Sequence, residues 1–167
     1  MKTNLLFDFT VNRENSTVIV KREFNAEKSL IWDAFTKPEI LDQWWAPKPW
    51  VSKTKSMNFE VGGRRLYAMC GPNGEEHWAL ADFTSISPNT NFQYLDAFCD
   101  ENGTINDEFP RSEWNLDFTE KEGITLVDIT IAHKELADLE KIIELGFKEG
   151  FTMTLDFLGE LITQLKQ

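Results

Sequence analysis

Residues that could carry catalysis or hold a metal are few in this sequence of 167 amino acids. The two histidines, His77 and His133, fall on separate predicted strands, and neither Cys-x-x-Cys nor His-x-x-x-His spacing occurs. Because a metal site needs three or four clustered ligands, we expect no metal and no other cofactor. Covalent catalysis is also disfavoured, since no Gly-x-Ser-x-Gly turn is present and neither Cys70 nor Cys99 adjoins a histidine. The sequence therefore favours a protein that is not an enzyme, with catalysis as the weaker alternative.

Three carboxylates lie within or next to predicted strands. Glu76 and Asp82 alternate in phase with Trp78, and Asp96 alternates in phase with Tyr94. A carboxylate that faces an apolar cavity has a raised pKa and can act as an acid or a base. The simpler expectation, which we favour, is that each of the three lies near a strand end in water.

Aromatic residues make up 13% of the chain, with 13 phenylalanines and 6 tryptophans. Side chains of this size fill a core or line a cavity, and Tyr, Trp and Met are typical of adaptable, mostly apolar ligand sites. A solid core and a ligand cavity are equal alternatives for them. The alternation of residues along the strands, and the spacing of apolar residues along the last helix, predict which of these side chains face the interior. These candidate cavity residues are Met57, Phe59, Tyr67, Met69, Trp78, Tyr94, Trp114, Phe118, Phe147, Phe151 and Leu158.

Residues 43–50 read QWWAPKPW and add one further candidate. Trp44 and Trp45 end a predicted short helix, on which neighbouring side chains point about 100° apart, so the two indoles cannot share one environment. We expect one of them to pack beneath the helix and Trp45 to lie at the rim of the cavity. Pro47 and Pro49 then end the helix and make a rigid exit toward the next strand.

The elements that must position these residues are short strands and helices. A helical stripe of apolar residues spans 134–167, but Gly146 and Gly150 interrupt it. Its continuous part could therefore begin near Phe147, with residues 136–144 forming a separate turn or short helix. Two shorter helices are predicted at 25–36 and 38–45, and strands at 16–24, 51–59, 64–70, 77–86, 91–99, 112–120 and 124–133.

Strands at hairpin spacing followed by one long helix predict an α+β fold. We expect a curved antiparallel sheet of about six to seven strands, wrapped around the C-terminal helix, with two short helices after the first strand. One domain would occupy residues 16–167, and residues 1–15 would form an N-terminal extension. Apolar residues 5–11 of that extension could add an edge strand or a dimer contact, so monomer and homodimer both remain open.

The charge of the chain restricts its partners and location. Lys and Arg number 17 against 28 Asp and Glu, which gives a net charge of −11 and an isoelectric point near 4.6. Such a surface repels phosphates, so we expect neither nucleic acid nor anionic membrane as a partner. No apolar run approaches the roughly 18 residues of a membrane span. The two cysteines are far apart in the sequence, which indicates buried thiols in a reducing compartment. The expected location is therefore cytoplasmic.

Four blocks along the chain resemble a known family in their order and spacing. They read FNAEKSLIWDAFTKPEILDQWWAP, FEVGGRRLYAMCGPNGEE, FTSISPNTNFQYLDAFCDENG and EGFTMTLDFLGEL. Together they are similar to START-like, SRPBCC-type helix-grip proteins, in the branch named for the activator of the ninety-kilodalton heat-shock protein ATPase. Two positions depart from the family pattern: Phe151 stands where Trp is typical, and Ala81 stands where Gly is frequent.

The resemblance implies the helix-grip fold and three functional alternatives. The leading one is binding of a small hydrophobic or aromatic molecule between the sheet and the C-terminal helix. A second is contact with a chaperone, because the branch is named for a heat-shock ATPase activator. A third is cyclase or hydrolase chemistry on the same scaffold, which would need a polar constellation in the pocket.

Overall fold

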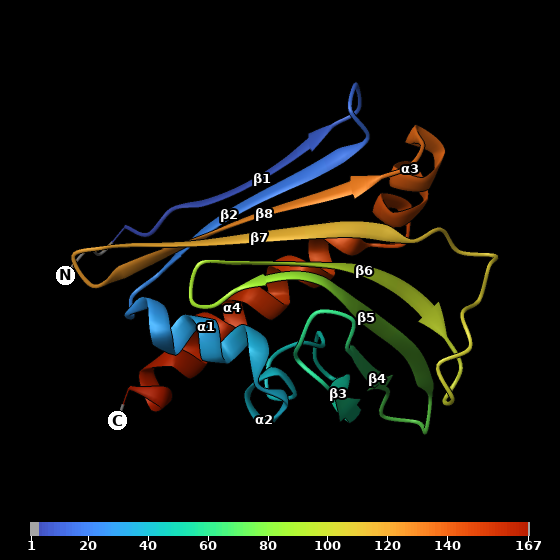
Figure 1. Cartoon of the computed structure of the whole chain (residues 1–167), viewed down its shortest axis with the longest axis horizontal. Helices are drawn as coiled ribbons and strands as arrows, with labels where there is room; N and C mark the ends of the chain where they lie inside the picture. Colours follow the sequence, from blue (N-terminus) through green and yellow to red (C-terminus); the bar gives the residue numbers. More distant parts are fainter. Residues whose placement is uncertain (1–3, 167) are drawn as a thin grey trace.

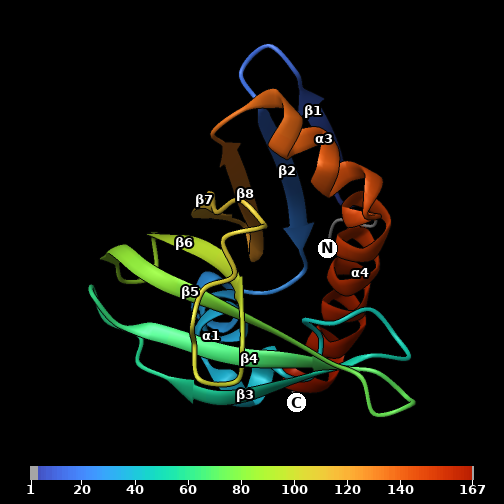
Figure 2. The same ribbon diagram turned by 90° about the vertical axis from the view of Figure 1, so that its right-hand side faces the viewer.

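The computed structural model describes residues 4–166 as one antiparallel sheet that curves around a long C-terminal helix. Figures 1 and 2 show α4 on the concave side of this sheet, with α1 and α2 near one of its ends. The strands are β1 (Phe7–Asn12), β2 (Thr17–Phe24), β3 (Val51–Met57), β4 (Arg64–Cys70), β5 (Glu76–Ser87), β6 (Asn91–Cys99), β7 (Ser112–Lys121) and β8 (Ile124–His133). The helices are α1 (Lys28–Thr36), α2 (Pro38–Leu41), α3 (Leu136–Glu144) and α4 (Phe147–Leu165).

The sheet has eight strands in the order β1-β2-β8-β7-β6-β5-β4-β3. The predicted α+β helix-grip fold is confirmed, with slightly more strands than expected. The additional strand is β1, which pairs with β2 from Phe7↔Arg22 to Asn12↔Thr17 and forms one edge of the sheet. The strands β2 and β8 are rich in β-branched residues, which favour strands, and β2 pairs with β8 over its whole length.

The C-terminal helical region divides at Gly146, as the sequence indicates. Gly146 has a φ of 90°, a left-handed conformation that glycine adopts without steric cost. The short helix α3 ends before it and α4 begins after it, so the chain changes direction between the two. The long helix then buries one stripe against the sheet, with Phe151, Leu155, Leu158 and Ile162 among the buried residues.

The second short helix is shorter than predicted. The helix α2 has Pro38 at its first position but ends at Leu41, and residues 42–46 continue as turns and bends rather than helix. Asp42 therefore occupies the end of α2, where its carboxylate accepts hydrogen bonds from Thr54 and Ser52 of β3. These bonds fix the corner that carries Trp44 and Trp45 to the edge of the sheet.

The inward face of β3 changes along the strand, and Met57 lies on the inward side as predicted. In β3, the polar residues Ser52 and Thr54 bond to the inward-pointing Arg65, and the register shifts between Thr54 and Ser56. A bulge of this kind reverses which alternate residues face inward, so Met57 packs on the main core although Val51 is exposed.

In β5 the expected inward position of Trp78 is wrong. Trp78 pairs with Ala68 and Cys99 and packs with Leu66 and Leu80 in a small cluster on the outer face. This outer cluster is partly covered by Ile105 of the loop after β6. Because both faces of β5 carry apolar residues, alternation alone could not distinguish them.

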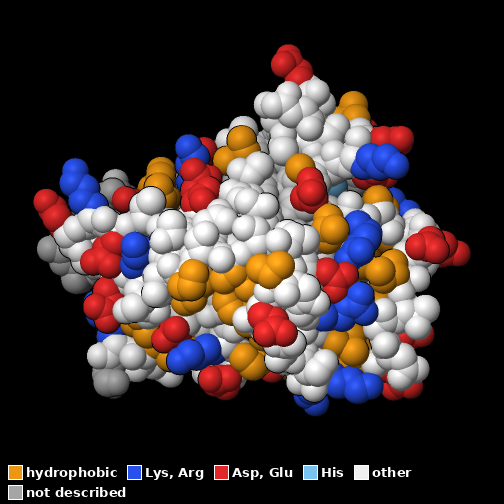
Figure 3. Space-filling model, in the orientation of Figure 1, with side chains coloured by type: hydrophobic (Ala, Val, Ile, Leu, Met, Phe, Trp, Pro, Cys, Tyr) orange, Lys and Arg blue, Asp and Glu red, His pale blue; other side chains and the backbone are white. Residues whose placement is uncertain are grey.

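The surface mixes charged and apolar side chains. Figure 3 shows acidic and basic groups interspersed on one face, with small hydrophobic areas between them. Within residues 4–166, no helix is long and apolar enough to cross a membrane.

Candidate ligand-binding cavity

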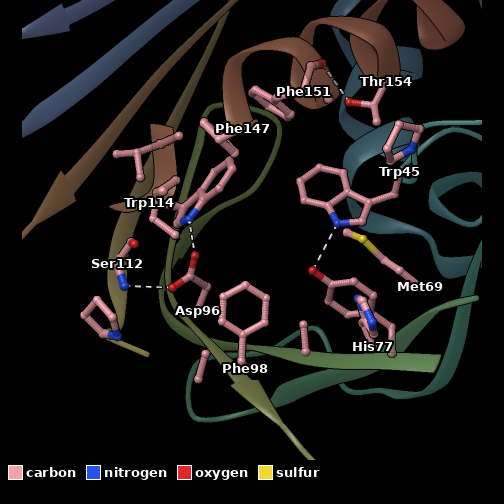
Figure 4. A pocket seen from close by; sticks show the side chains of 18 of the residues that line it. Trp45, Met69, His77, Asp96, Phe98, Ser112, Trp114, Phe147, Phe151 and Thr154 are labelled. Carbon is pink, nitrogen blue, oxygen red and sulfur yellow. Dashed lines mark hydrogen bonds between the residues drawn. The ribbon is translucent and has the colours of Figure 1, made fainter. Parts of the chain in front are cut away.

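A cavity of about 250 Å³ lies between the inner face of the sheet and the first turns of α4 (Figure 4). Strands β4 to β8 supply its floor and walls, α4 supplies its roof, and Ile142 of α3 and Pro110 of the β6–β7 loop also line it. The lining is mainly aromatic and aliphatic, and it includes Trp45, Tyr67, Met69, Phe98, Trp114, Ile131, Phe147 and Phe151.

Small residues leave this volume unfilled. Ala79 pairs with Tyr67 and Phe98 and presents only a methyl group on the lined face of β5. Gly150 and Thr154 are the corresponding small residues of α4. A Cβ atom at Gly150 would meet only Pro47, at 3.8 Å, which is an ordinary van der Waals contact. The space therefore comes from small side chains on both walls rather than from a distortion of the backbone.

Two indole N–H groups point toward the sheet across the cavity (Figure 4). Nε1 of Trp114 donates to Oδ2 of Asp96 at 2.8 Å, and Nε1 of Trp45 donates to the hydroxyl of Tyr67 at 3.1 Å. The two indole rings lie 6.0 Å apart between centroids, and each also contacts Phe151. These bonds fix the ring orientations of the aromatic walls.

Asp96 is the carboxylate that borders the cavity. Its Oδ1 accepts the backbone N–H of Ser112 at 2.7 Å, and its Oδ2 accepts the Trp114 indole. Burial raises the pKa of Asp96 above its ordinary value, although the hydrogen bonds from Ser112 and Trp114 act against this shift. The favoured expectation of a water-exposed strand end is therefore wrong for Asp96.

Asp82 lies on the outer side of the sheet instead. It accepts hydrogen bonds from Nε of Arg64 at 2.5 Å and from Nη2 of Arg111 at 2.7 Å. Burial alone would raise the pKa of Asp82, but these two guanidinium groups hold it below its ordinary value. Asp82 therefore connects β5 to the loop that ends at Arg111, and this contact lies away from the cavity.

A smaller chamber of about 50 Å³ adjoins the cavity and shares Trp45, Tyr67, Asp96 and Trp114 with it. Arg65 also lines the smaller chamber, and its Nη2 donates to Oδ1 of Asp42 at 3.3 Å and to Oγ of Ser52 at 3.0 Å.

The guanidinium of Arg65 also lies 3.9 Å from the ring centroid of Tyr67. Burial lowers the pKa of Arg65 and raises those of Tyr67 and Tyr94. The chamber is therefore bordered by un-ionised phenols and one paired cation.

The structure separates the candidate residues into four groups. Phe59, Phe118 and Leu158 pack in the main core away from both spaces, and Trp78 lies on the outer face. Met57 and Tyr94 line the smaller chamber. Trp45, Tyr67, Met69, Trp114, Phe147 and Phe151 line the cavity together.

Several residues that line the cavity were not predicted from the sequence. His77 and His133 were interpreted as ordinary strand residues, yet both line the cavity from opposite walls of the sheet. Ala79 and Phe98 were missed because the larger Trp78 and Leu80 mark the other face of β5. The sequence feature that could have indicated the cavity is the pair Ala79 and Ala81, because these two small residues leave room on one face of an otherwise bulky strand.

Metal-binding clusters of three or more His, Cys, Asp or Glu residues are not found among the residues that the structure describes. Cys70 and Cys99 are free and half-buried, less enclosed than the sequence suggested.

An antiparallel sheet closed by a long C-terminal helix over an aromatic cavity defines the helix-grip class of proteins. Within that class, the chain belongs to the family described as Activator of Hsp90 ATPase homolog 1-like protein, whose model matches residues 25–163.

Solved structures with the same fold come from several bacteria. Protein Ms6760 from Mycobacterium smegmatis is 25% identical, with 95% of this chain and 96% of that chain covered and a TM-score of 0.86. A protein from Staphylococcus epidermidis is 26% identical, with coverages of 93% and 94% and a TM-score of 0.82. A protein from Arthrobacter aurescens is 24% identical, with coverages of 94% and 91% and a TM-score of 0.89, which supports the fold alone. No curated protein matches the chain significantly.

Proposed function

We propose that this protein binds a small, mostly apolar aromatic molecule in the cavity between its sheet and α4. The observation that carries the proposal is the cavity itself, about 250 Å³ in volume and lined mainly by aromatic and aliphatic side chains. Apolar pockets with a few convergent polar groups are typical of small-molecule sites, and this volume lies just below their usual range of about 300–1,000 Å³, which suits a small ligand.

The arrangement of the rings supports a flat ligand. Phe147 and Phe151 stack on each other at 5.2 Å, and Trp114 meets both of them edge to face. An aromatic ligand can therefore contact both ring faces and ring edges of this wall. Met69 adds a flexible side chain that adapts to ligands of different outline.

Binding is tested by titrating the protein with two-ring aromatic compounds and following heat release or ligand-observed NMR signals. A substitution that fills the cavity supplies the specific test: Ala79→Leu places a larger side chain where the β5 wall presents only a methyl group. We expect the affinity for any bound aromatic to fall about tenfold or more, because the ligand and the new side chain compete for one volume.

The matched control is Ala132→Leu. Ala132 is a half-buried strand alanine like Ala79, but its side chain lies on the face of β8 opposite to Ile131 and His133. This variant should bind with unchanged affinity. Equal losses in the two variants, or no loss in Ala79→Leu, would place the binding site elsewhere.

Contact with a heat-shock ATPase is a second proposal, and the family description is its only support. It is tested by titrating the protein into the purified ATPase and measuring the rate of hydrolysis. An unchanged rate together with no detectable complex would remove it.

A further inference from the structure

The carboxylate of Asp96 borders the cavity without an opposite charge in direct contact. Within residues 4–166 it makes no ion pair. The nearby Arg111 donates from Nε to the backbone carbonyl of Asp96 at 3.0 Å and directs its Nη2 to Asp82. Each carboxylate oxygen accepts one hydrogen bond from a neutral donor, and a carboxylate has about four acceptor positions. Acceptor capacity therefore remains at the cavity wall.

His133 provides a second unsatisfied group in the same lining. Its side chain is buried, with 6% of the residue exposed, and its Nδ1 has no hydrogen-bond partner among the described residues. Buried polar atoms in folded proteins are nearly always paired, so this nitrogen lacks a partner. Nδ1 itself is fully buried, so it pairs with a molecule in the cavity only when the imidazole ring turns toward that molecule.

Ser112 connects these two groups across the sheet. Its backbone N–H donates to Asp96 of β6, and its Cα pairs with that of His133 on β8. Adjacent strands lie about 4.8 Å apart, so the backbones of Asp96 and His133 are about 10 Å apart with β7 between them. This separation suits the opposite ends of a small aromatic molecule rather than a single substituent.

The surroundings favour a neutral ligand over a charged one. A carboxylate or phosphate would be repelled by Asp96. An organic cation would approach the rings of Tyr67 and Trp45, which Arg65 already contacts at 3.9 Å and 5.7 Å from their centroids. Arg65 holds a positive charge there with Asp42 as its partner. A hydroxyl supplies the hydrogen that Asp96 can accept and brings no net charge.

From these contacts we infer that the cavity recognises an uncharged aromatic hydroxyl compound. One phenol-type hydroxyl donates to Asp96, and a second polar substituent at the far end of the ring system pairs with Nδ1 of His133 when the imidazole ring turns toward the ligand. A hydroxyl suits this second position because it can donate or accept and so fits either tautomer of the imidazole. The inference rests on the proposed function, since it names the ligand class of the same cavity.

The test compares four probes that share a naphthalene ring, which is close in size to one indole. They are 2-naphthol, its methyl ether 2-methoxynaphthalene, naphthalene-2,6-diol and the cation 2-naphthylmethylammonium. The dissociation constants are measured by titration calorimetry with the full chain at pH 7. We expect 2-naphthol to bind about tenfold or more tightly than its methyl ether, as for the loss of a hydrogen bond to a charged group. The diol should bind more tightly still.

Two variants assign the contacts. Asp96→Asn should remove most of the preference for naphthol over the ether, whereas the control Asp128→Asn, on the outer face of β8, should keep it. His133→Phe should remove only the additional affinity of the diol. The indole N–H signal of Trp44, which donates to the backbone carbonyl of Ala34 in the main core, reports whether each variant keeps its fold. The comparison of probes in the unmodified protein stands even if Asp96→Asn unfolds.

The outcomes separate this inference from the proposed function. Equal affinity for naphthol and its ether, or tighter binding of the cation, would overturn the inference while cavity binding stands. Failure of all four probes to bind at millimolar concentration would overturn both.

Discussion

At the residue scale, burial acts in opposite directions on the two titratable groups of the cavity wall. Burial raises the pKa of Asp96, so the folded protein keeps this proton to a higher pH than the unfolded chain does. Burial lowers the pKa of His133, with the Ser16 carbonyl and Asp138 acting against the shift. The contribution of Asp96 to stability therefore decreases as pH rises above its ordinary pKa of 3.8, and that of His133 decreases as pH falls below 6.5.

The variant His133→Gln tests this second dependence. The unfolded chain takes up a proton at His133 near pH 6.5, whereas the folded chain takes it up only at a lower pH. The free energy of unfolding of the unmodified protein should therefore fall from pH 7.5 to pH 5 more steeply than that of the variant. Urea unfolding across this range measures both slopes, and parallel slopes would show that His133 is not buried as described.

Two arginine ion pairs should differ in their effect on stability. Arg65 has 4% of its surface exposed and bonds to Asp42, Ser52 and Thr54. Arg65→Ala should destabilise the fold by about 3 kcal/mol, the lower end for a broken buried pair, because Asp42 keeps some contact with water.

The control Arg22→Ala breaks the ion pair with Asp156, whose side chain is 57% exposed. Its ion-pair contribution should be about 0–1 kcal/mol. Chemical denaturation of both variants checks the difference, and similar losses would contradict the structural role assigned to Arg65.

At the element scale, the sequence predicts most of the scaffold. The break between α3 and α4 at Gly146 follows from glycine placement, and the strands follow from short apolar runs separated by turn residues. The face of β5 could not be predicted, because Trp78 and Leu80 pack on a second cluster outside the sheet. In β3, Met57 faces the interior as predicted, but the inward positions of Ser52 and Thr54 could not be predicted, because the bulge after Thr54 depends on pairing with β4.

Substitution of Gly146, between the two helices, and of Gly159, within α4, tests the break between α3 and α4. Gly146→Ala must adopt a φ near 90°, so we expect a loss of about 1 kcal/mol. Gly159 lies within α4, where a Cβ atom would meet only Arg22 at 3.5 Å, so Gly159→Ala should stabilise by about 0.5–1 kcal/mol. Thermal unfolding of both variants gives the signs. Equal signs would contradict a helix break at Gly146.

At the scale of the whole molecule, the sheet and α4 enclose a space that no sequence pattern specifies directly. The aromatic candidates were named from their alternation, but the same residues could equally fill a solid core. The volume depends on Ala79, Gly150 and Thr154, which are too small to meet across the gap. Their significance appears only when the two walls are placed opposite each other.

The central claim, that the cavity binds an aromatic ligand, is tested most directly by NMR of the tryptophan side chains. The chain has 6 tryptophans, of which Trp45 and Trp114 line the cavity and Trp78 lies on the outer face. On titration with 2-naphthol, the indole N–H signals of Trp45 and Trp114 should shift most while that of Trp78 stays in place. Unmoved signals from Trp45 and Trp114 at the highest soluble concentration of 2-naphthol, or shifts confined to Trp78, would contradict the claim.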